Sequence, residues 1–127
     1  SGLKHVDKIK KIQGKEYIII NAQEKIKDTI IGTITSIISF SKVYKDGTII
    51  VGMAYNDEKI KISARISGKN NNTSRNLKEL LDSVIYTLGS GMAGGHKAAA
   101  GCLINKEDEN KFIEILKKKL EVEMIKI

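Results

Sequence analysis

The sequence predicts an α/β fold: a single domain with a mixed β-sheet of about five strands flanked by helices, in the order β-α-β-β-α-β-α-β. Three observations lead to this prediction. Short apolar runs rich in β-branched residues alternate with segments whose apolar residues recur at helical spacing. A two-residue turn signal joins two of the strand-like runs into a hairpin. The length of 127 residues is that of one ordinary domain with its own hydrophobic core.

The first third of the chain is predicted to hold a lead-in, a strand and a helix. Residues 3–14 place apolar side chains among lysines at a spacing that suits a short exposed helix or lead-in. Residues 16–21, EYIIIN, form a continuous apolar run, as expected of a strand buried on both faces. Residues 29–41 have strand-like propensity, but their spacing predicts a helix with Asp28 as N-cap. The isoleucines of its single apolar stripe are Ile30, Ile34, Ile37 and Ile38.

A β-hairpin is predicted in the middle of the chain. Residues 48–55 and 58–67 are strand-like, and Asn56-Asp57 joins them. The second strand alternates, so that its apolar residues point one way and its polar residues point the other. The polar side of this strand consists of Lys59, Lys61, Ser63 and Arg65.

The second half predicts a helix, a strand, a helix and a strand. Residues 76–89, NLKELLDSVIYTLG, carry one leucine-rich stripe, with Asn76 and Glu79 at capping-box spacing and Gly89 at the stop. A short strand is predicted near 100–104 and a helix near 106–118. The last residues, LEVEMIKI, alternate and predict a terminal strand.

Charge and composition indicate the cellular compartment and the chemical class of the binding partner. The net charge of +7 comes from 20 lysines and 2 arginines, which favours a polyanionic partner, although lysines spread over solvated faces explain the total equally well. The single Cys102 excludes an internal disulfide and is typical of a reduced intracellular setting. Neither a membrane span nor a signal peptide is recognisable, so a cytoplasmic protein without membrane association is expected. Residues 1–2, Ser-Gly, are interpreted as a cloning remnant.

Residues 89–101, GSGMAGGHKAAAG, concentrate five glycines around one histidine. Their G-x-G-x-x-G match follows a predicted helix instead of a strand, so we reject a dinucleotide-binding fingerprint. Free backbone N–H groups in a glycine-rich loop can form an anion-binding nest, to which His96 and Lys97 would add side-chain donors. A flexible turn with a surface histidine is the alternative. Arg65 is likewise either a phosphate ligand or a member of a structural ion pair.

The string GGHKAAAG resembles the Gly-Gly-Gly-His…Ala-Ala-Gly signature of the DHH-associated domain, the C-terminal substrate-binding domain of DHH phosphoesterases. The segments IGTITSIIS, KIKISARIS and NLKELLDSV are similar to a helix, a strand and a second helix of that domain. The resemblance covers residues 16–119 and is closest to archaeal-type RecJ-like exonucleases. Ala93 departs from it, because the signature has a glycine there.

The resemblance implies a ligand-binding site in this domain and a catalytic site in a separate domain. It assigns contacts with a phosphate or base to Gly94, Gly95 and His96, and a phosphate contact to Arg65 with Ser63 beside it. The catalytic centre of such enzymes is a manganese cluster, for which magnesium is the other candidate metal, held by Asp and His residues of a separate N-terminal DHH domain. No Asp-His-His triplet occurs in this sequence, so no catalytic or metal-binding residue is assigned.

The expected function follows from this assignment. Residues 1–15 are a lead-in, and residues 16–127 are a nucleic-acid-binding domain without a cofactor of its own. It would hold single-stranded DNA or RNA, or a short oligonucleotide, for an N-terminal DHH domain to cleave. The alternative is a non-catalytic scaffold that docks onto a replication or repair protein.

Overall fold

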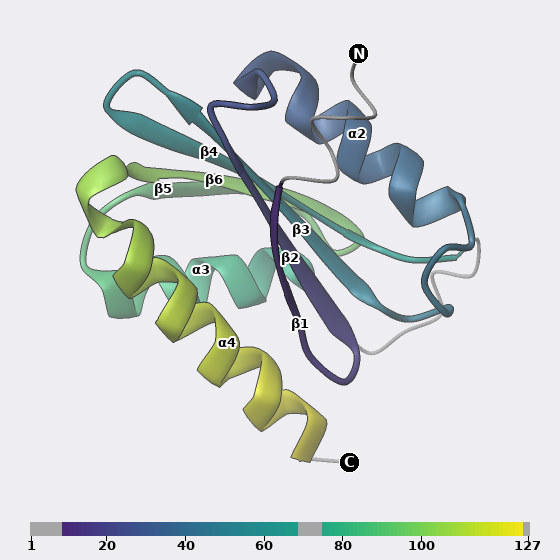
Figure 1. The fold of residues 1–127 in the computed structure, drawn as a ribbon. Helices are drawn as coiled ribbons and strands as arrows, with labels where there is room; N and C mark the ends of the chain where they lie inside the picture. Colours follow the sequence, from purple (N-terminus) through teal and green to yellow (C-terminus); the bar gives the residue numbers. More distant parts are fainter. Residues whose placement is uncertain (1–8, 69–74, 126–127) are drawn as a thin grey trace.

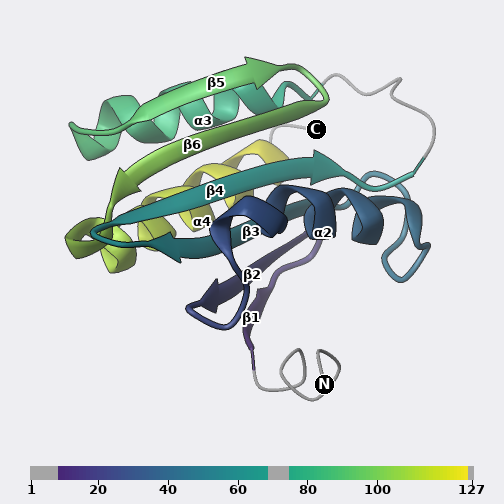
Figure 2. The ribbon, with the colours of Figure 1, turned by 90° about the horizontal axis from the view of Figure 1, so that it is seen from above.

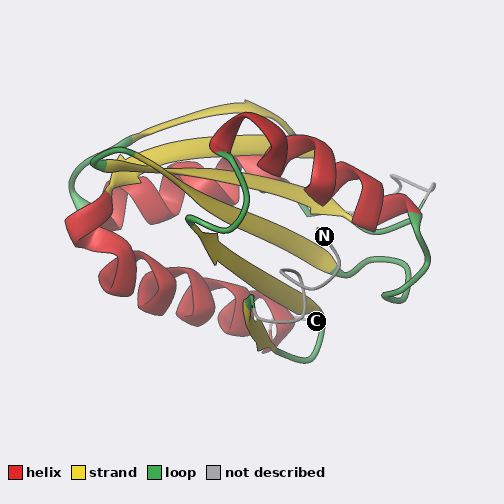
Figure 3. Ribbon diagram, turned by 45° about the horizontal axis from the view of Figure 1, so that its top comes forward, coloured by secondary structure: helices red, strands yellow, loops and turns green. Residues whose placement is uncertain are grey.

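The computed structural model describes residues 9–68 and 75–125. They form a six-stranded mixed sheet with one helix, α2, on one face and two helices, α3 and α4, on the other (Figures 1 and 3). The predicted α/β class with a mixed sheet is confirmed. The elements in chain order are β1 (Lys10–Gln13), β2 (Tyr17–Gln23), α2 (Asp28–Phe40), β3 (Ile49–Asn56), β4 (Lys59–Ile66), α3 (Leu77–Leu88), β5 (Met92–His96), β6 (Ala99–Asn105), the 3-10 turn η1 (Lys106–Asp108) and α4 (Glu109–Ile125).

The strands lie in the order β1-β2-β3-β4-β6-β5. Only β2 and β3 pair in parallel, and every other neighbouring pair is antiparallel. A parallel pair needs a crossover connection, and α2 supplies it. This places α2 over the middle of the sheet, against β3 and β4, and leaves β6 and β5 beyond its reach (Figure 2).

The face of the sheet beneath α3 and α4 carries the larger hydrophobic core. Phe112 of α4 and Leu81 of α3 are fully buried and pack in one cluster with Ile62 of β4. The hydroxyl of Tyr17 in β2 donates a hydrogen bond to Glu121 Oε2 at 2.6 Å, which attaches the second half of α4 to the sheet. Burial, followed by this hydrogen bond, raises the pKa of Tyr17 to about 12.

A polar network fixes the start of α4 against the same face. Glu109 accepts hydrogen bonds from the Asn21 side-chain amide at 2.6 Å and from the Tyr55 hydroxyl at 2.5 Å. Burial alone would raise the pKa of Glu109, but the hydrogen bonds from Asn21 and Tyr55 outweigh it, so the pKa lies below its usual value. The carboxylate therefore stays ionised and holds β2, β3 and α4 together.

On the opposite face, α2 approaches the sheet closely through small side chains. A Cβ atom added to Gly52 of β3 would lie 2.3 Å from the hydroxyl of Thr35, so only glycine permits this separation. The buried side of the helix consists of Ile31, Thr35 and Ser39. The Thr35 hydroxyl donates to the carbonyl of Ile31 at 2.7 Å, which satisfies its buried polar group.

The predicted helix over 29–41 is confirmed, but its predicted stripe and N-cap are wrong. Ile30 and Ile37 are 44% and 61% exposed, and of that stripe Ile38 packs partly against the core. The physical reason is the close approach at Gly52, which favours small side chains over large ones on the buried side. The N-cap is Lys27, without a side-chain cap, and Asp28 lies in the first turn, where a negative charge suits the helix dipole.

The hairpin and the helix after it are confirmed. The turn lies one residue later than predicted, because Asp57 and Glu58 connect β3 to β4, and the two strands pair antiparallel along their full length. Asn76 Oδ1 accepts a hydrogen bond from the Glu79 backbone N–H at 3.1 Å, as expected of the N-cap. Gly89 ends α3 in the left-handed conformation, with φ of 87°.

Two further sequence predictions near the glycine-rich segment and the N-terminus are wrong. Residues 10–13, expected in a short exposed helix or lead-in, form the strand β1 instead, because their backbone pairs with β2. Residues 92–96, expected in a loop, form β5. Hydrogen bonding to β6 stabilises this strand although glycine is depleted in strands. Residues 3–8 lie outside the described residues.

The predicted terminal strand is also wrong, because residues 120–125 continue α4. Leu120 lies four and eight residues after Leu116 and Phe112, and all three are buried in the core. This helical stripe overrides the short alternation of LEVEMIKI. Residues 126–127 lie outside the described residues.

Candidate nucleic-acid interface

The candidate site is the face of β4, β6 and β5 on the α2 side of the sheet, named here the open face. No described helix lies over β6 and β5 on this side, whereas α3 covers them from behind (Figure 2). Strand alternation and register define its residues. They are Lys61, Ser63 and Arg65 of β4, Ala99, Gly101 and Leu103 of β6, and Met92, Gly94 and His96 of β5.

The register brings Arg65 and His96 into one row across the sheet. Arg65 lies opposite Ala99, and Ala99 lies opposite His96. Since neighbouring strands are about 4.8 Å apart, the two Cα atoms are separated by roughly 10 Å. The small Ala99 between them leaves the space above β6 open to both side chains. Strand pairing therefore brings Arg65 and His96, which were singled out separately in the sequence, to the same row of the sheet.

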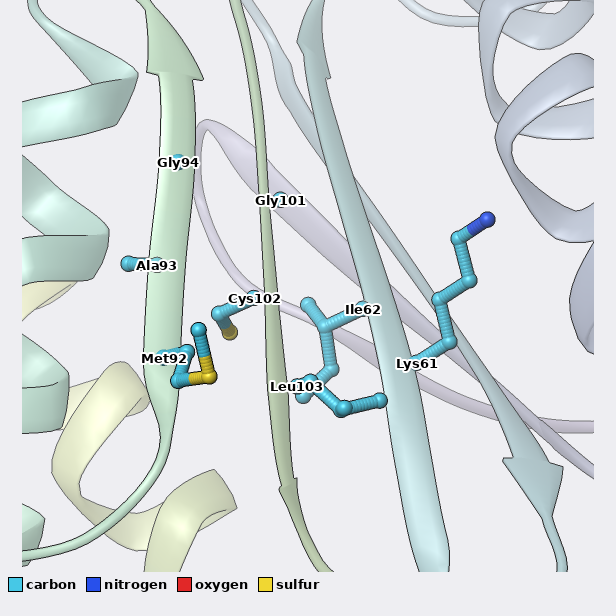
Figure 4. A pocket seen from close by; sticks show the side chains of 8 residues that line it. All are labelled: Lys61, Ile62, Met92, Ala93, Gly94, Gly101, Cys102 and Leu103. Atoms are coloured by element: carbon cyan, nitrogen blue, oxygen red, sulfur yellow. The ribbon is translucent and has the colours of Figure 1, made fainter.

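The next two rows differ in chemistry from the first. The second row, Ser63, Gly101 and Gly94, has almost no side chains on β6 and β5. The third row is Lys61, Leu103 and Met92, and it borders an open hollow of about 550 Å³ (Figure 4). Apart from Lys61, the side chains that line this hollow are apolar or absent. The open face thus changes from charged to apolar along the strands.

Arg65 forms no salt bridge among the described residues. Its Nη1 atom donates to the Ser63 hydroxyl at 3.1 Å and to the Ala64 carbonyl at 2.8 Å, which orients the guanidinium on the open face. Burial lowers the pKa of Arg65, although an arginine keeps its charge at neutral pH. Arg75 has the structural role instead, because its Nη2 atom lies 2.6 Å from Glu16 Oε2.

The glycines of the 89–101 segment do not share one role. Four of them are required by the fold, since each has positive φ or would place a Cβ atom within 3 Å of the backbone or of a core side chain. These four are Gly89, Gly91, Gly95 and Gly101. A Cβ atom at Gly94 would meet nothing within 4 Å, and its φ is not positive. The fold does not require glycine at position 94, so contact with a molecule outside the domain would explain it better.

The remaining predicted residues occupy different positions around Gly94. His96 is exposed at the end of β5, and Lys97 is exposed in the turn that follows. The Lys97 carbonyl accepts a hydrogen bond from the Leu77 N–H at 2.8 Å, which fixes this turn against the start of α3. Ser63 is only 5% exposed and contacts Arg65, while Gly95 alternates toward the α3 side of the sheet.

Sequence reasoning missed Met92 and Leu103, and it noted Lys61 only as part of a polar strand side. Interpretation of residues 92–96 as a loop hid the alternation that places Met92, Gly94 and His96 on one face. A strand interpretation of M-A-G-G-H would have revealed it, since the period of two is present in the sequence.

Across residues 9–68 and 75–125, no group of three or more His, Cys, Asp or Glu side chains is arranged to hold a metal ion. None of the helices in these ranges is long and apolar enough to cross a membrane.

Residues 14–122 match the DHHA1 domain family. Because this match spans most of the chain, the protein belongs to that family. No curated protein is significantly similar to it in sequence.

Solved structures share the fold at low sequence identity. The C-Ala domain of alanyl-tRNA synthetase from Aquifex aeolicus has a TM-score of 0.65 at 17% identity, over 87% of this chain and 97% of that one. A DHH-domain structure of a member of the S1P family of ribosomal proteins has a TM-score of 0.66 at 18% identity, over 94% of this chain. A pGpG-specific phosphodiesterase from Vibrio cholerae has a TM-score of 0.59 at 15% identity, also over 94%. The matched regions are 29% and 38% of the latter two chains.

Proposed function

We propose that this domain binds a single strand of nucleic acid on its open face and presents it to a DHH phosphoesterase domain of RecJ-like exonuclease type. The observation that carries the proposal is the row of Arg65, Ala99 and His96, in which two side chains with N–H donors flank a small residue. DHHA1 domains generally accompany an N-terminal DHH domain and bind nucleic-acid or nucleotide substrates. The metal-dependent chemistry would belong to that other domain.

The chemistry of the row suits a phosphate. Arginine offers a planar fork of donors that matches phosphate oxygens, and here Nη1 is oriented by Ser63 and the Ala64 carbonyl. The imidazole of His96 adds a donor from the other side, and the exposed Lys97 adds a cation at the end of the row. No Asp or Glu occurs within β4, β5 or β6, so no carboxylate on these strands repels an anion.

The flat second row supports the proposal independently of the first row. Gly94 is free of structural demands, and a residue without a side chain lets a ligand approach the backbone closely. Gly95 enables the backbone path into the turn, where its φ of 113° would strain any other residue. We therefore assign Gly94 to ligand contact and Gly95 to the shape of the hairpin that carries His96 and Lys97.

The test is to measure strand binding by two pairs of variants. Arg65→Ala and His96→Ala should each weaken binding of a fluorescein-labelled oligothymidylate by about 1.5–3 kcal/mol, or roughly ten- to 150-fold, if each loses a charge-assisted hydrogen bond. The control pair is Lys111→Ala with Lys118→Ala, two exposed lysines of α4 on the far side of the sheet. If the control pair lowers affinity as much as the site pair, binding is diffuse electrostatics and the proposed site is wrong.

A docking module is the second candidate function, and α2 favours it. After Asp28 this surface helix has no charged residue, in a chain that is 29% charged. Its outward side carries Ile30 and Ile37, and Phe40 at its end is 63% exposed. An uncharged apolar helix face is typical of a contact with another protein or domain. If oligonucleotides of every length fail to bind even at low salt, this docking function becomes the better assignment.

A further inference from the structure

We infer that the strand footprint on this domain is about three nucleotides, one for each row of the open face, and that the third row binds a base without reading its identity. This inference rests on the proposed function and adds to it the length of the ligand and the role of Lys61, Leu103 and Met92.

The spacing of the rows sets the length. Residues two apart on a strand are separated by about 6.6 Å, which is close to the phosphate repeat of an extended single strand. Arg65 and Lys61 are four residues apart on β4, so two such steps, or about 13 Å, separate the cations at the two ends. Because α2 packs against β4 and Ser63 is buried, the nucleic-acid strand is placed over β6, between β4 and β5. It would then have one phosphate near Arg65, one above Gly101 and one within reach of Lys61.

The boundaries of the open face stop the footprint at three rows. At one end β5 and β6 meet in the turn that holds Lys97. At the other end β5 begins at Met92, so the face loses its outer strand there. One row further, the Lys59 ammonium donates to Asn105 Oδ1 at 2.5 Å, so these two polar groups are paired with each other.

The third row has the chemistry of a contact with a base. Met92 is 74% exposed although it is apolar, and it adjoins Leu103 across the β5–β6 pair. Figure 4 shows Gly94 and Gly101 without side chains near these two residues, and the Lys61 side chain on β4 pointing away from β6 and β5. Methionine is flexible and polarisable, so it packs against surfaces of different shape.

The same row lacks the groups that distinguish bases. Base identity is read by side-chain or backbone groups that hydrogen-bond to base edges. Lys61 is the one polar side chain among those lining the hollow, and an ammonium suits the strand backbone. Contact with Met92 and Leu103 would therefore add affinity for every sequence in similar measure.

The experiment is a length series of 5′-phosphorylated di-, tri-, tetra- and hexathymidylate, with affinities corrected for the number of binding registers. We expect affinity to rise from dinucleotide to trinucleotide and to change by less than about twofold beyond it. Lys61→Ala should weaken trinucleotide binding about three- to tenfold and leave the dinucleotide unaffected. For three phosphates the log-log salt slope should be roughly −2 in the wild type, and about 0.7 shallower in Lys61→Ala.

A second arm tests the base contact. Met92→Ser should weaken trithymidylate and triadenylate binding by similar factors, because it removes apolar contact and no hydrogen bond. The matched control is Tyr86→Ser, which removes an 88% exposed side chain from α3 on the opposite side of the sheet. A Met92→Ser effect confined to one sequence, or equal to that of the control, overturns the base contact.

The outcomes separate this inference from the proposed function. If Arg65→Ala weakens binding but the dinucleotide binds as tightly as the hexanucleotide, the footprint is wrong and the proposed function stands. A corrected affinity that keeps rising to the hexanucleotide also overturns the footprint. If no oligonucleotide binds, or if Arg65→Ala has no effect at any length, the proposed function itself fails.

Discussion

The two faces of the sheet differ in the residue types that the same strands carry. Beneath α3 and α4, every inward position of β4 is a buried apolar residue, from Ile60 to Ile66. On the open face the alternate positions of β4 are basic or hydroxylic, and those of β6 and β5 are small except at Leu103, Met92 and His96. Packing explains the first set of residues completely, whereas the fold alone does not explain Gly94 or Arg65. Residues that packing does not explain are therefore the best candidates for a functional role.

The largest expected effect is on the free energy of unfolding and comes from the core beneath α3 and α4. Phe112→Ala should lower the free energy of unfolding by about 3–5 kcal/mol, because it removes a fully buried ring from the centre of the core. Urea denaturation followed by circular dichroism measures this loss. The folded fraction should keep its wild-type Kd for the strand, since Phe112 lies on the other side of the sheet. A loss below about 1 kcal/mol would show that this core is packed less tightly than described.

Two neighbouring glycines give a sharper test at a smaller scale. Gly95→Ala should lower the free energy of unfolding by at least about 1–2 kcal/mol, because φ is positive and the new Cβ atom would lie 2.6 Å from the backbone of Ala100. Gly94→Ala should change it by less than about 0.5 kcal/mol, since the space above Gly94 is open.

Gly94 should matter for strand binding although it matters little for stability. Gly94→Val should weaken strand binding more than tenfold, or about 1.4 kcal/mol, with the folded state retained, because the side chain would fill the flat second row. Thermal unfolding and fluorescence anisotropy on the same samples measure both quantities. Equal affinity of Gly94→Val and the wild type would remove Gly94 from the site.

The smallest expected effect lies on the outer side of α2. Ile37→Ser should change the free energy of unfolding of the isolated domain by no more than about 0.5 kcal/mol, because the side chain is 61% exposed. Ile31→Ala, on the buried side, is the matched comparison and should cost about 2–5 kcal/mol. A large loss in Ile37→Ser would mean that the outward side of α2 is covered when the domain is alone in solution.

The sequence was sufficient for those elements in which local signals and packing agree. In α3, the cap at Asn76, the leucine stripe and the stop at Gly89 all indicate the same helix, and β4 alternates cleanly. Prediction failed where pairing or packing with another element decides the outcome. Pairing with β6 makes a strand of the glycine-rich β5, and the gap at Gly52 determines which side of α2 is buried.

The candidate site shows the same division between local and distant information. The polar side of β4 and the unusual glycine-histidine segment were recognisable, so Arg65, Gly94 and His96 could be named from the sequence. Their common row could not, because it depends on the register of β4 with β6 and of β6 with β5. The same lack of register concealed Met92 and Leu103, whose side chains are ordinary until the third row is known.

The position of β5 at the border of the sheet affects how the protein would respond to a ligand. This strand has a single strand neighbour, β6, so its backbone hydrogen bonds are made along one side only. Border segments of this kind open locally at lower cost than a central strand such as β4, and their amide protons exchange faster with solvent. A ligand that contacts β4 and β5 together would connect an inner strand to a border strand. Binding would then be visible as slower amide exchange in β5, far from any change in the core.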